Sequence, residues 1–197
     1  MKEQGTALVL SLLVVVCLSG LGLGLATASG AERTVAGHAH GAIDTMLAAD
    51  AAVESVLGDV AAAPDWSTWL SGVTTSFRDT SLVVTTPAKA RVDLAAITAE
   101  LQSDGTYGTG ANAPVWHLIA WGRLAARLGL PSDANLNYVA VWAADDPAET
   151  DGRPDLDANH ILLLHGEAFG LGAGRCGVDV MIERTPAGPR VRSWRSR

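Results

Sequence analysis

Residues 6–28 read TALVLSLLVVVCLSGLGLGLATA, an apolar run that holds no charged side chain. At about 1.5 Å of helical rise per residue, such a run can cross the hydrocarbon core of a bilayer, which is about 30 Å thick. Nothing else in the chain is as apolar over a comparable length. We therefore expect residues 6–28 to form a transmembrane helix that anchors the rest of the chain.

The charges around this run set its expected orientation. The head, residues 1–5, carries Lys2 and the N-terminal amine, and positive charge favours the cytoplasmic side. The large remainder then lies outside the cytoplasm, and the chain as a whole has a formal charge of −7. This acidic balance argues against nucleic acid as a partner. The C-terminal arginines predict a solvated tail, with a DNA contact as the lesser alternative: Arg190, Arg192, Arg195 and Arg197.

A cleaved secretory signal is the competing interpretation of the same run. Residues 26–28 (Ala-Thr-Ala) fit the small-residue pattern of a signal peptidase site, and cleavage there would leave Ser29 at the new N-terminus. The apolar run is longer than the core of about 7–15 residues that signal peptides use. The helical pattern also continues beyond it, which favours a retained anchor.

Residues 29–63 continue the helix as an amphipathic segment. They are rich in alanine, contain no proline, and end at Pro64, which cannot continue a helix. Apolar residues recur in this segment at spacings of three and four, as on one face of a helix: Met46, Ala49, Val53, Val56 and Val60. We expect this stripe to pack against a globular domain formed by residues 64–197.

The globular domain is predicted to be rich in β-strands. A short helix is expected over residues 93–102, with Asp93 at its cap. Runs rich in β-branched and apolar residues predict strands at 73–77, 81–86, 115–121, 138–143, 161–169, 178–184 and 191–194. The last three form an antiparallel meander. The fold class is α+β: a long N-terminal helix packed on an antiparallel sheet.

An acidic loop is the densest polar feature. Residues 145–159 contain six carboxylates and Asn159 between two predicted strands. Ca²⁺ takes six to eight oxygen ligands, and uncompensated carboxylates repel one another. A Ca²⁺ site is therefore one hypothesis, although the spacing does not match an EF-hand, and its ligands would be Asp146, Asp151, Asp155 and Asp157. A solvated loop of turn-favouring residues is the alternative.

Catalytic motifs are missing from the sequence. It has no Ser–His–Asp order, no phosphate-binding loop, no HExxH and no CxxC. We therefore expect no enzyme and no catalytic residue, and a function in assembly or binding.

The combination of these features resembles type IV pilin-like proteins, and more narrowly minor pilins of the PilX type. The resemblance rests on Gly5 at the end of a short charged leader, the apolar run, an alanine-rich segment and the terminal meander. It extends to the stretches at 47–54, 114–122, 141–149 and 164–170. It implies that a prepilin peptidase cuts after Gly5 and that Thr6 becomes a methylated N-terminus. The mature subunit would wait in the inner membrane and then join a filament whose core is a bundle of N-terminal helices.

The resemblance also implies candidate assembly residues along the helix over 6–63: Leu10, Gly20, Gly24, Met46, Val53 and Val56. Gly20 and Gly24 form a GxxxG pattern that suits close helix contact. Major pilins carry a glutamate at the fifth mature position, where this chain has Leu10. This departure favours a minor subunit that primes or caps a type IV pilus or a type II secretion pseudopilus. Expected partners are other minor pilins, the major pilin, the prepilin peptidase and the inner-membrane assembly platform.

The alternative function is a single-pass or secreted envelope protein that works as a binding module. Its acidic loop would hold Ca²⁺, and its N-terminal run would serve only as an anchor or a secretion signal. The position of cleavage distinguishes the two functions, because a pilin starts at Thr6 and a secreted protein starts near Ser29.

Overall fold

The structure, a computed structural model, describes residues 3–86, 89–108, 112–133, 137–170 and 174–197. The chain divides into two compact units, Met1–His40 and Gly41–Arg197. Helix α1 (Glu3–Ala62) contributes to both of them.

The first unit is helical throughout its described residues. Every described side chain from residue 7 to residue 40 is exposed. By length and composition, α1 is apolar enough to cross a membrane from Ala7 onward. The apolar helix predicted over residues 6–28 is thus confirmed as a helix.

The second unit is built on a five-stranded antiparallel sheet. Its strands lie in chain order: β3 (His117–Arg123), β4 (Tyr138–Asp145), β5 (Ile161–Phe169), β6 (Arg175–Thr185) and β7 (Gly188–Ser196). A small antiparallel pair consists of β1 (Val83–Thr85) and β2 (Arg91–Asp93). Short helical segments complete the unit: α2 (Ser67–Leu70), η1 (Gly105–Tyr107), α4 (Leu124–Arg127) and the longer α3 (Leu94–Ser103). The expected α+β class is confirmed.

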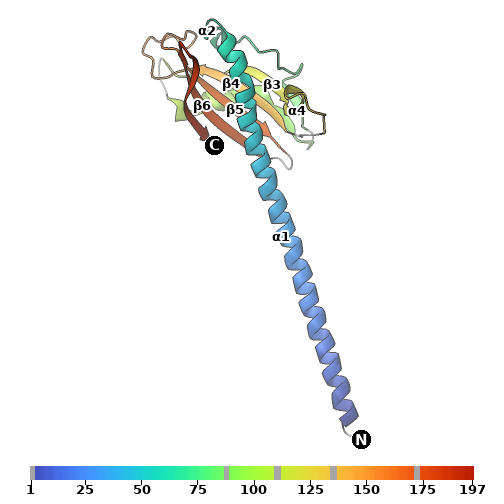
Figure 1. Cartoon of the computed structure of the whole chain (residues 1–197). Coiled ribbons are helices and arrows are strands. Elements are labelled where there is room, and N and C mark those ends of the chain that lie inside the picture. Colours follow the sequence, from blue (N-terminus) through green and yellow to red (C-terminus); the bar gives the residue numbers. More distant parts are fainter. Residues whose placement is uncertain (1–2, 87–88, 109–111, 134–136, 171–173) are drawn as a thin grey trace. The chain divides into compact units, whose positions relative to one another are not determined.

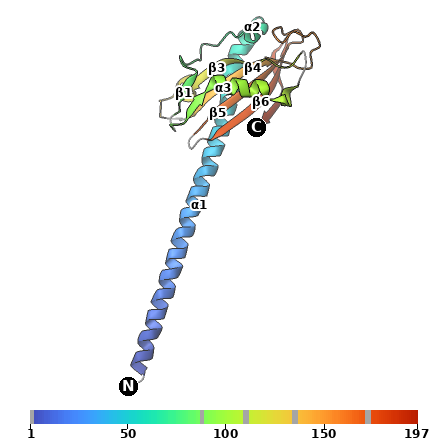
Figure 2. The ribbon, with the colours of Figure 1, turned by 180° about the vertical axis from the view of Figure 1, so that it is seen from behind.

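Both faces of the sheet are covered. Residues 41–62 of α1 lie across one face (Figure 1), and α3 lies on the opposite face (Figure 2). Strand β4 therefore divides its side chains: Val139 and Val141 join the α1 side, whereas Ala140 and Trp142 join the α3 side. This is why β4 is buried along its whole length instead of alternating between core and solvent.

The predicted apolar stripe of α1 is confirmed at four positions and wrong at one. Ala49, Val53, Val56 and Val60 are at most 1% exposed in the core against the sheet. Met46 is 37% exposed, because the buried face also takes in Ala48 and Ala52, which moves its centre away from Met46. Small alanines on this face let the helix lie close to the strands.

Local signals predicted α3 and its cap correctly. The helix begins after Asp93, whose carboxylate accepts hydrogen bonds from the backbone N–H groups of Ala95 (3.1 Å) and Ala96 (3.2 Å). Strand β5 spans the predicted residues 161–169, and β1, β3, β4, β6 and β7 overlap their predicted ranges. Helix α2 and strand β2 had no matching prediction.

Two sequence predictions are wrong. Residues 73–77 are not a strand: they follow the edge of β3 through single contacts such as Thr75 N–H to the Ile119 carbonyl (2.8 Å). The C-terminal arginines are not a frayed tail, because they lie in or directly after β7, which pairs along β6. Trp194 of β7 also donates from Nε1 to Asp50 of α1 (2.8 Å).

Candidate functional site

The first candidate site is the apolar surface of α1 in the N-terminal unit. Gly5 and Thr6 fall in its opening turns, and their side chains lie outside the described residues. Leu10 is 67% exposed, and its apolar neighbours are exposed as well. A surface this apolar is unfavourable in water and suits lipid or other helices.

Gly20 and Gly24 leave part of this surface open. They lie four residues apart, on one face of the helix, and a Cβ added at either would meet no atom within 4 Å. A second helix can approach the backbone closely at such a pair. The structure therefore gives the predicted GxxxG pattern the accessible surface that it needs.

The remaining assembly candidates lie in the second unit. Val53 and Val56 are fully buried against the sheet of their own chain, whereas Met46 is partly exposed. A role of Val53 and Val56 in assembly would therefore be indirect, through holding residues 41–62 on the sheet. Met46 keeps a surface that another subunit could contact.

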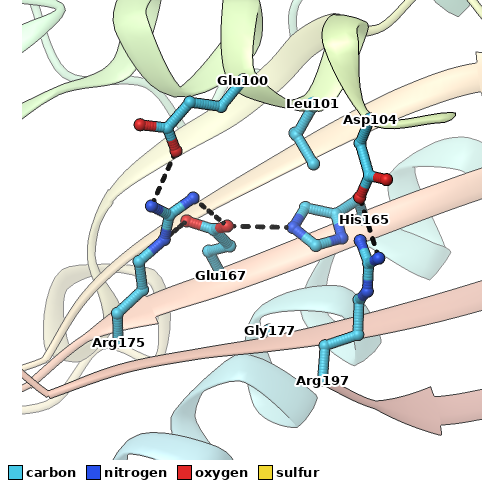
Figure 3. A pocket seen from close by; sticks show the side chains of 8 residues that line it. All are labelled: Glu100, Leu101, Asp104, His165, Glu167, Arg175, Gly177 and Arg197. Atoms are coloured by element: carbon cyan, nitrogen blue, oxygen red, sulfur yellow. Dashed lines mark hydrogen bonds and ion pairs between the residues drawn. The ribbon is translucent and has the colours of Figure 1, made fainter. Parts of the chain in front are cut away.

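A second candidate site is a charged network between α3 and the sheet, buried only at its centre, where His165 and Glu167 lie (Figure 3). His165 of β5 lies between two carboxylates, with Nδ1 2.6 Å from Asp179 Oδ1 and Nε2 3.1 Å from Glu167 Oε1. Both ring nitrogens face carboxylate oxygens, an arrangement that favours the doubly protonated imidazolium over the neutral ring. Burial lowers the pKa of His165, but these hydrogen bonds outweigh burial and raise it above the usual value.

Two arginines complete the network. The Arg175 guanidinium donates to both oxygens of Glu167 (2.9 and 2.7 Å) and to Glu100 of α3 (2.9 Å). Arg197 donates to Asp104 (2.8 Å) and to the hydroxyl of Tyr107 (2.8 Å). The charges are paired, and the network joins α3 and the end of the chain to the sheet.

Sequence reasoning missed this network. It placed His165 on a strand but gave it no partner. The usable signal was that His165 and Glu167 are two apart, and so on the same face of β5. Their partners come from β6 and α3, and the pairing of His165 with Asp179 depends on the register between β5 and β6.

The four predicted Ca²⁺ ligands lie in the acidic loop between β4 and β5, but they do not share one environment. Asp151 and Asp155 are exposed, and Asp155 pairs with Arg153 (2.9 Å). Asp146 is buried, and its carboxylate accepts from the Ala148 N–H (3.0 Å) and from the side-chain amide of Asn159 (3.1 Å). Of the four, Asp157 is the one that belongs to a converging group of carboxylates.

That group, called here the carboxylate triad, consists of Asp145, Glu149 and Asp157. Each contributes one oxygen, and these oxygens lie within 4.8 Å of one another. Burial and the nearby Glu149 raise the pKa of Asp145 to about 7. Burial likewise raises the pKa of Glu149 and of Asp157. Asp145 and Glu149 were not among the predicted ligands. The sequence pattern that could have identified them is a carboxylate at the end of a buried strand, followed by a second carboxylate four residues later.

The chain thus combines an N-terminal helix that is apolar enough to cross a membrane with an α+β domain. The model of the PilX N-terminal family matches residues 4–54. Over this segment the chain is similar to the N-terminal part of PilX-type, type IV pilin-like proteins. Residues 55–197 lie outside the match. Searches among curated proteins and among solved structures found no match.

Proposed function

We propose that this chain is a minor pilin or pseudopilin that primes or caps a filament, either a type IV pilus or a type II secretion pseudopilus. It acts by assembly: its N-terminal helix leaves the membrane and joins a bundle of similar helices. The observation that carries the proposal is the exposed apolar run of α1 up to residue 28, which holds no charged side chain and has Leu10 at the fifth position after the predicted cleavage point.

The apolar surface of α1 is suited both to the lipid of a membrane and to the helix bundle of a filament. Leucine and valine side chains are stable in lipid and equally stable among the apolar side chains of neighbouring helices. Transfer from membrane to filament therefore exchanges one apolar environment for another. Gly20 and Gly24 offer a place where helices can pack closely.

Leu10 supports a role at a filament end. In the resemblance described above, the corresponding glutamate of a major pilin pairs with the N-terminal amine of a neighbour. Leu10 cannot make that ion pair, so this subunit joins without a contact that repeats along the filament. Such a subunit suits a starting or terminal position, which is occupied once, better than a position in the repeating lattice.

Processing and location follow from the same proposal. A prepilin peptidase cuts after Gly5, Thr6 is methylated, and the helix remains in the inner membrane until the assembly platform extracts it. The domain over residues 64–197 lies outside the cytoplasm and contacts other minor pilins and the major pilin. Filament assembly does not require the chain to carry out catalysis.

The first test is the intact mass and the N-terminal sequence of the mature protein, purified from membranes of the organism that encodes it. We expect a start at Thr6 with an added methyl group. A start near Ser29 would show secretory cleavage and would overturn the proposal. An uncut Met1 would also overturn it, because it would leave a plain single-pass protein.

The second test concerns the role in the filament. Deletion of the gene should reduce the number of filaments, and complementation should restore it. The subunit should be present in sheared filaments at far lower abundance than the major pilin. The priming role would be contradicted if the deletion strain made as many filaments as the wild type, and if the wild-type strain processed the protein correctly.

A further inference from the structure

The carboxylate triad lies where strand β4 meets the acidic loop. Asp145 is the last residue of β4, and Glu149 and Asp157 come from the loop that leads to β5. Their exposed fractions are 2%, 8% and 7%, respectively. Three acidic side chains from two parts of the loop and one strand end thus converge in a site that is almost closed to water.

Each of these carboxylates keeps an oxygen without a partner. Asp145 Oδ1, Glu149 Oε2 and Asp157 Oδ1 are buried and have no hydrogen-bond donor among the described residues. A buried, unpaired carboxylate is costly, and three of them side by side also repel one another. The contrast with Glu167 is direct, because that buried carboxylate is paired with Arg175 and His165.

Two basic residues, His160 and Arg184, act electrostatically on Asp157 but do not satisfy the triad. His160 lies 3.9 Å from the other oxygen of Asp157, and its own side chain is 60% exposed. Arg184 donates its guanidinium hydrogens to the backbone carbonyls of Ala63 and Pro64. Neither of these groups forms an ion pair with Asp145 or Glu149 among the described residues.

We propose that Asp145, Glu149 and Asp157 bind a divalent metal ion, and that Ca²⁺ is the ion that fits best. The three donors are carboxylate oxygens, which suit hard cations. Ligands at 2.3–2.6 Å from Ca²⁺ lie up to roughly 5 Å apart, which accommodates the 4.8 Å limit found here. Mg²⁺ needs ligands at about 2.0–2.1 Å in near-ideal octahedral geometry, which three carboxylates fixed by the fold suit less well than the longer and more flexible Ca²⁺ coordination.

The surrounding loop is already held in place for this role. The second carboxylate oxygen of Glu149 accepts from the backbone N–H groups of Ala158 and Asn159. The Asp157 N–H donates to the hydroxyl of Ser67 in α2 (3.2 Å). These contacts orient the triad without using its unpartnered oxygens, so a cation would bind with little rearrangement of the loop. The site is independent of the filament role proposed above.

The test uses the full-length protein in detergent micelles, stripped with a chelator and then dialysed. Calorimetric titration with CaCl₂ should show one Ca²⁺ per chain, with Mg²⁺ at least about tenfold weaker. Thermal unfolding, followed by tryptophan fluorescence, should shift upward with Ca²⁺ concentration, because a ligand of the folded state stabilises it. Absence of Ca²⁺ binding at millimolar concentration, or tighter binding of Mg²⁺ than of Ca²⁺, would overturn the proposal.

Isosteric variants identify the ligands. Asp145→Asn, Glu149→Gln and Asp157→Asn should each weaken Ca²⁺ binding at least about tenfold, since affinity depends on the number of charged ligands. The metal-free variants should melt no lower than the metal-free wild type, because each substitution relieves repulsion. A purely structural role would instead lower the melting temperature and leave the Ca²⁺ response intact, which would contradict the assignment.

Asp151→Asn and Asp155→Asn are the matched controls, because they remove an exposed carboxylate from the same loop. Both should bind Ca²⁺ with the affinity of the wild type. Equal loss of binding in controls and triad variants would show diffuse attraction to an acidic loop and would overturn the site. The three triad variants are independent, so failure of one to fold leaves the other two to decide.

Discussion

Val53 of α1 packs directly against the backbone of Gly166 in β5. A Cβ on Gly166 would overlap the Val53 Cγ2 methyl, and it would also lie 3.3 Å from the Ala49 carbonyl oxygen. Gly166 is opposite Val141 and Val178 in the neighbouring strands. The helix therefore reaches the middle strand of the sheet at Gly166, a position that has no side chain to block its approach.

Replacing Gly166 tests this contact. Gly166→Ala should destabilise the domain by about 1–3 kcal/mol, because the added methyl forces α1 away from β5 or moves Val53 out of its rotamer. The measurement is denaturant unfolding of the full-length protein in micelles. Gly58→Ala is the control, since Gly58 is exposed on α1 and a Cβ there meets no atom within 4 Å. That control should gain up to about 1 kcal/mol from helix propensity, and equal effects at both sites would contradict the close contact.

The contacts of His165 predict that the folded protein loses stability as the pH rises above about 6.5. Its pKa is higher in the folded protein than in the unfolded chain, because the hydrogen bonds to Asp179 and Glu167 outweigh the effect of burial. The stability that this group contributes is complete below about pH 6.5 and is lost as pH rises through the folded pKa. The slope should reach at most about 1.4 kcal/mol per pH unit.

Comparison with a variant isolates the pH-dependent stability that His165 contributes. His165→Gln should be less stable than the wild type at pH 6, and the difference should narrow as the pH approaches 9. His117→Gln is the control: burial lowers the pKa of His117, so its contribution has the opposite sign and is lost as pH falls. Parallel stability curves for wild type and His165→Gln across this range would show that His165 is not the cation inferred from its contacts.

Leu10 predicts a change in subunit abundance. Leu10→Glu supplies the carboxylate that the resemblance assigns to major pilins, so we expect more copies of this chain in each sheared filament. The readout is the ratio of this subunit to the major pilin by quantitative mass spectrometry. Leu8→Glu is the control, because it carries the same cost of up to about 3 kcal/mol for an acidic group in a membrane helix but sits at a different position. If the ratio of this subunit to the major pilin rose in neither variant, or in both, the role given to Leu10 would be contradicted.

The sequence by itself determined the elements whose signals are local. A charge-free run is apolar whatever surrounds it, so the N-terminal helix followed from composition alone. Asp93 caps α3 through backbone groups two and three residues away, which a sequence motif encodes directly. The meander that ends the chain followed from short apolar runs separated by turns. The helical stripe through Val53 and Val56 followed from periodicity.

The tertiary structure decided everything that depends on distant partners. Residues 73–77 have the composition of a strand but follow the β3 edge through only a few hydrogen bonds, and the C-terminal arginines are ordered because β6 offers β7 a paired edge. The predicted acidic loop contained the right kind of side chains, but which of them converge depends on how the loop returns from β4 to β5. Asp145 and Glu149, and not Asp146, Asp151 or Asp155, therefore converge with Asp157, since burial and proximity are properties of the folded chain and not of spacing along it.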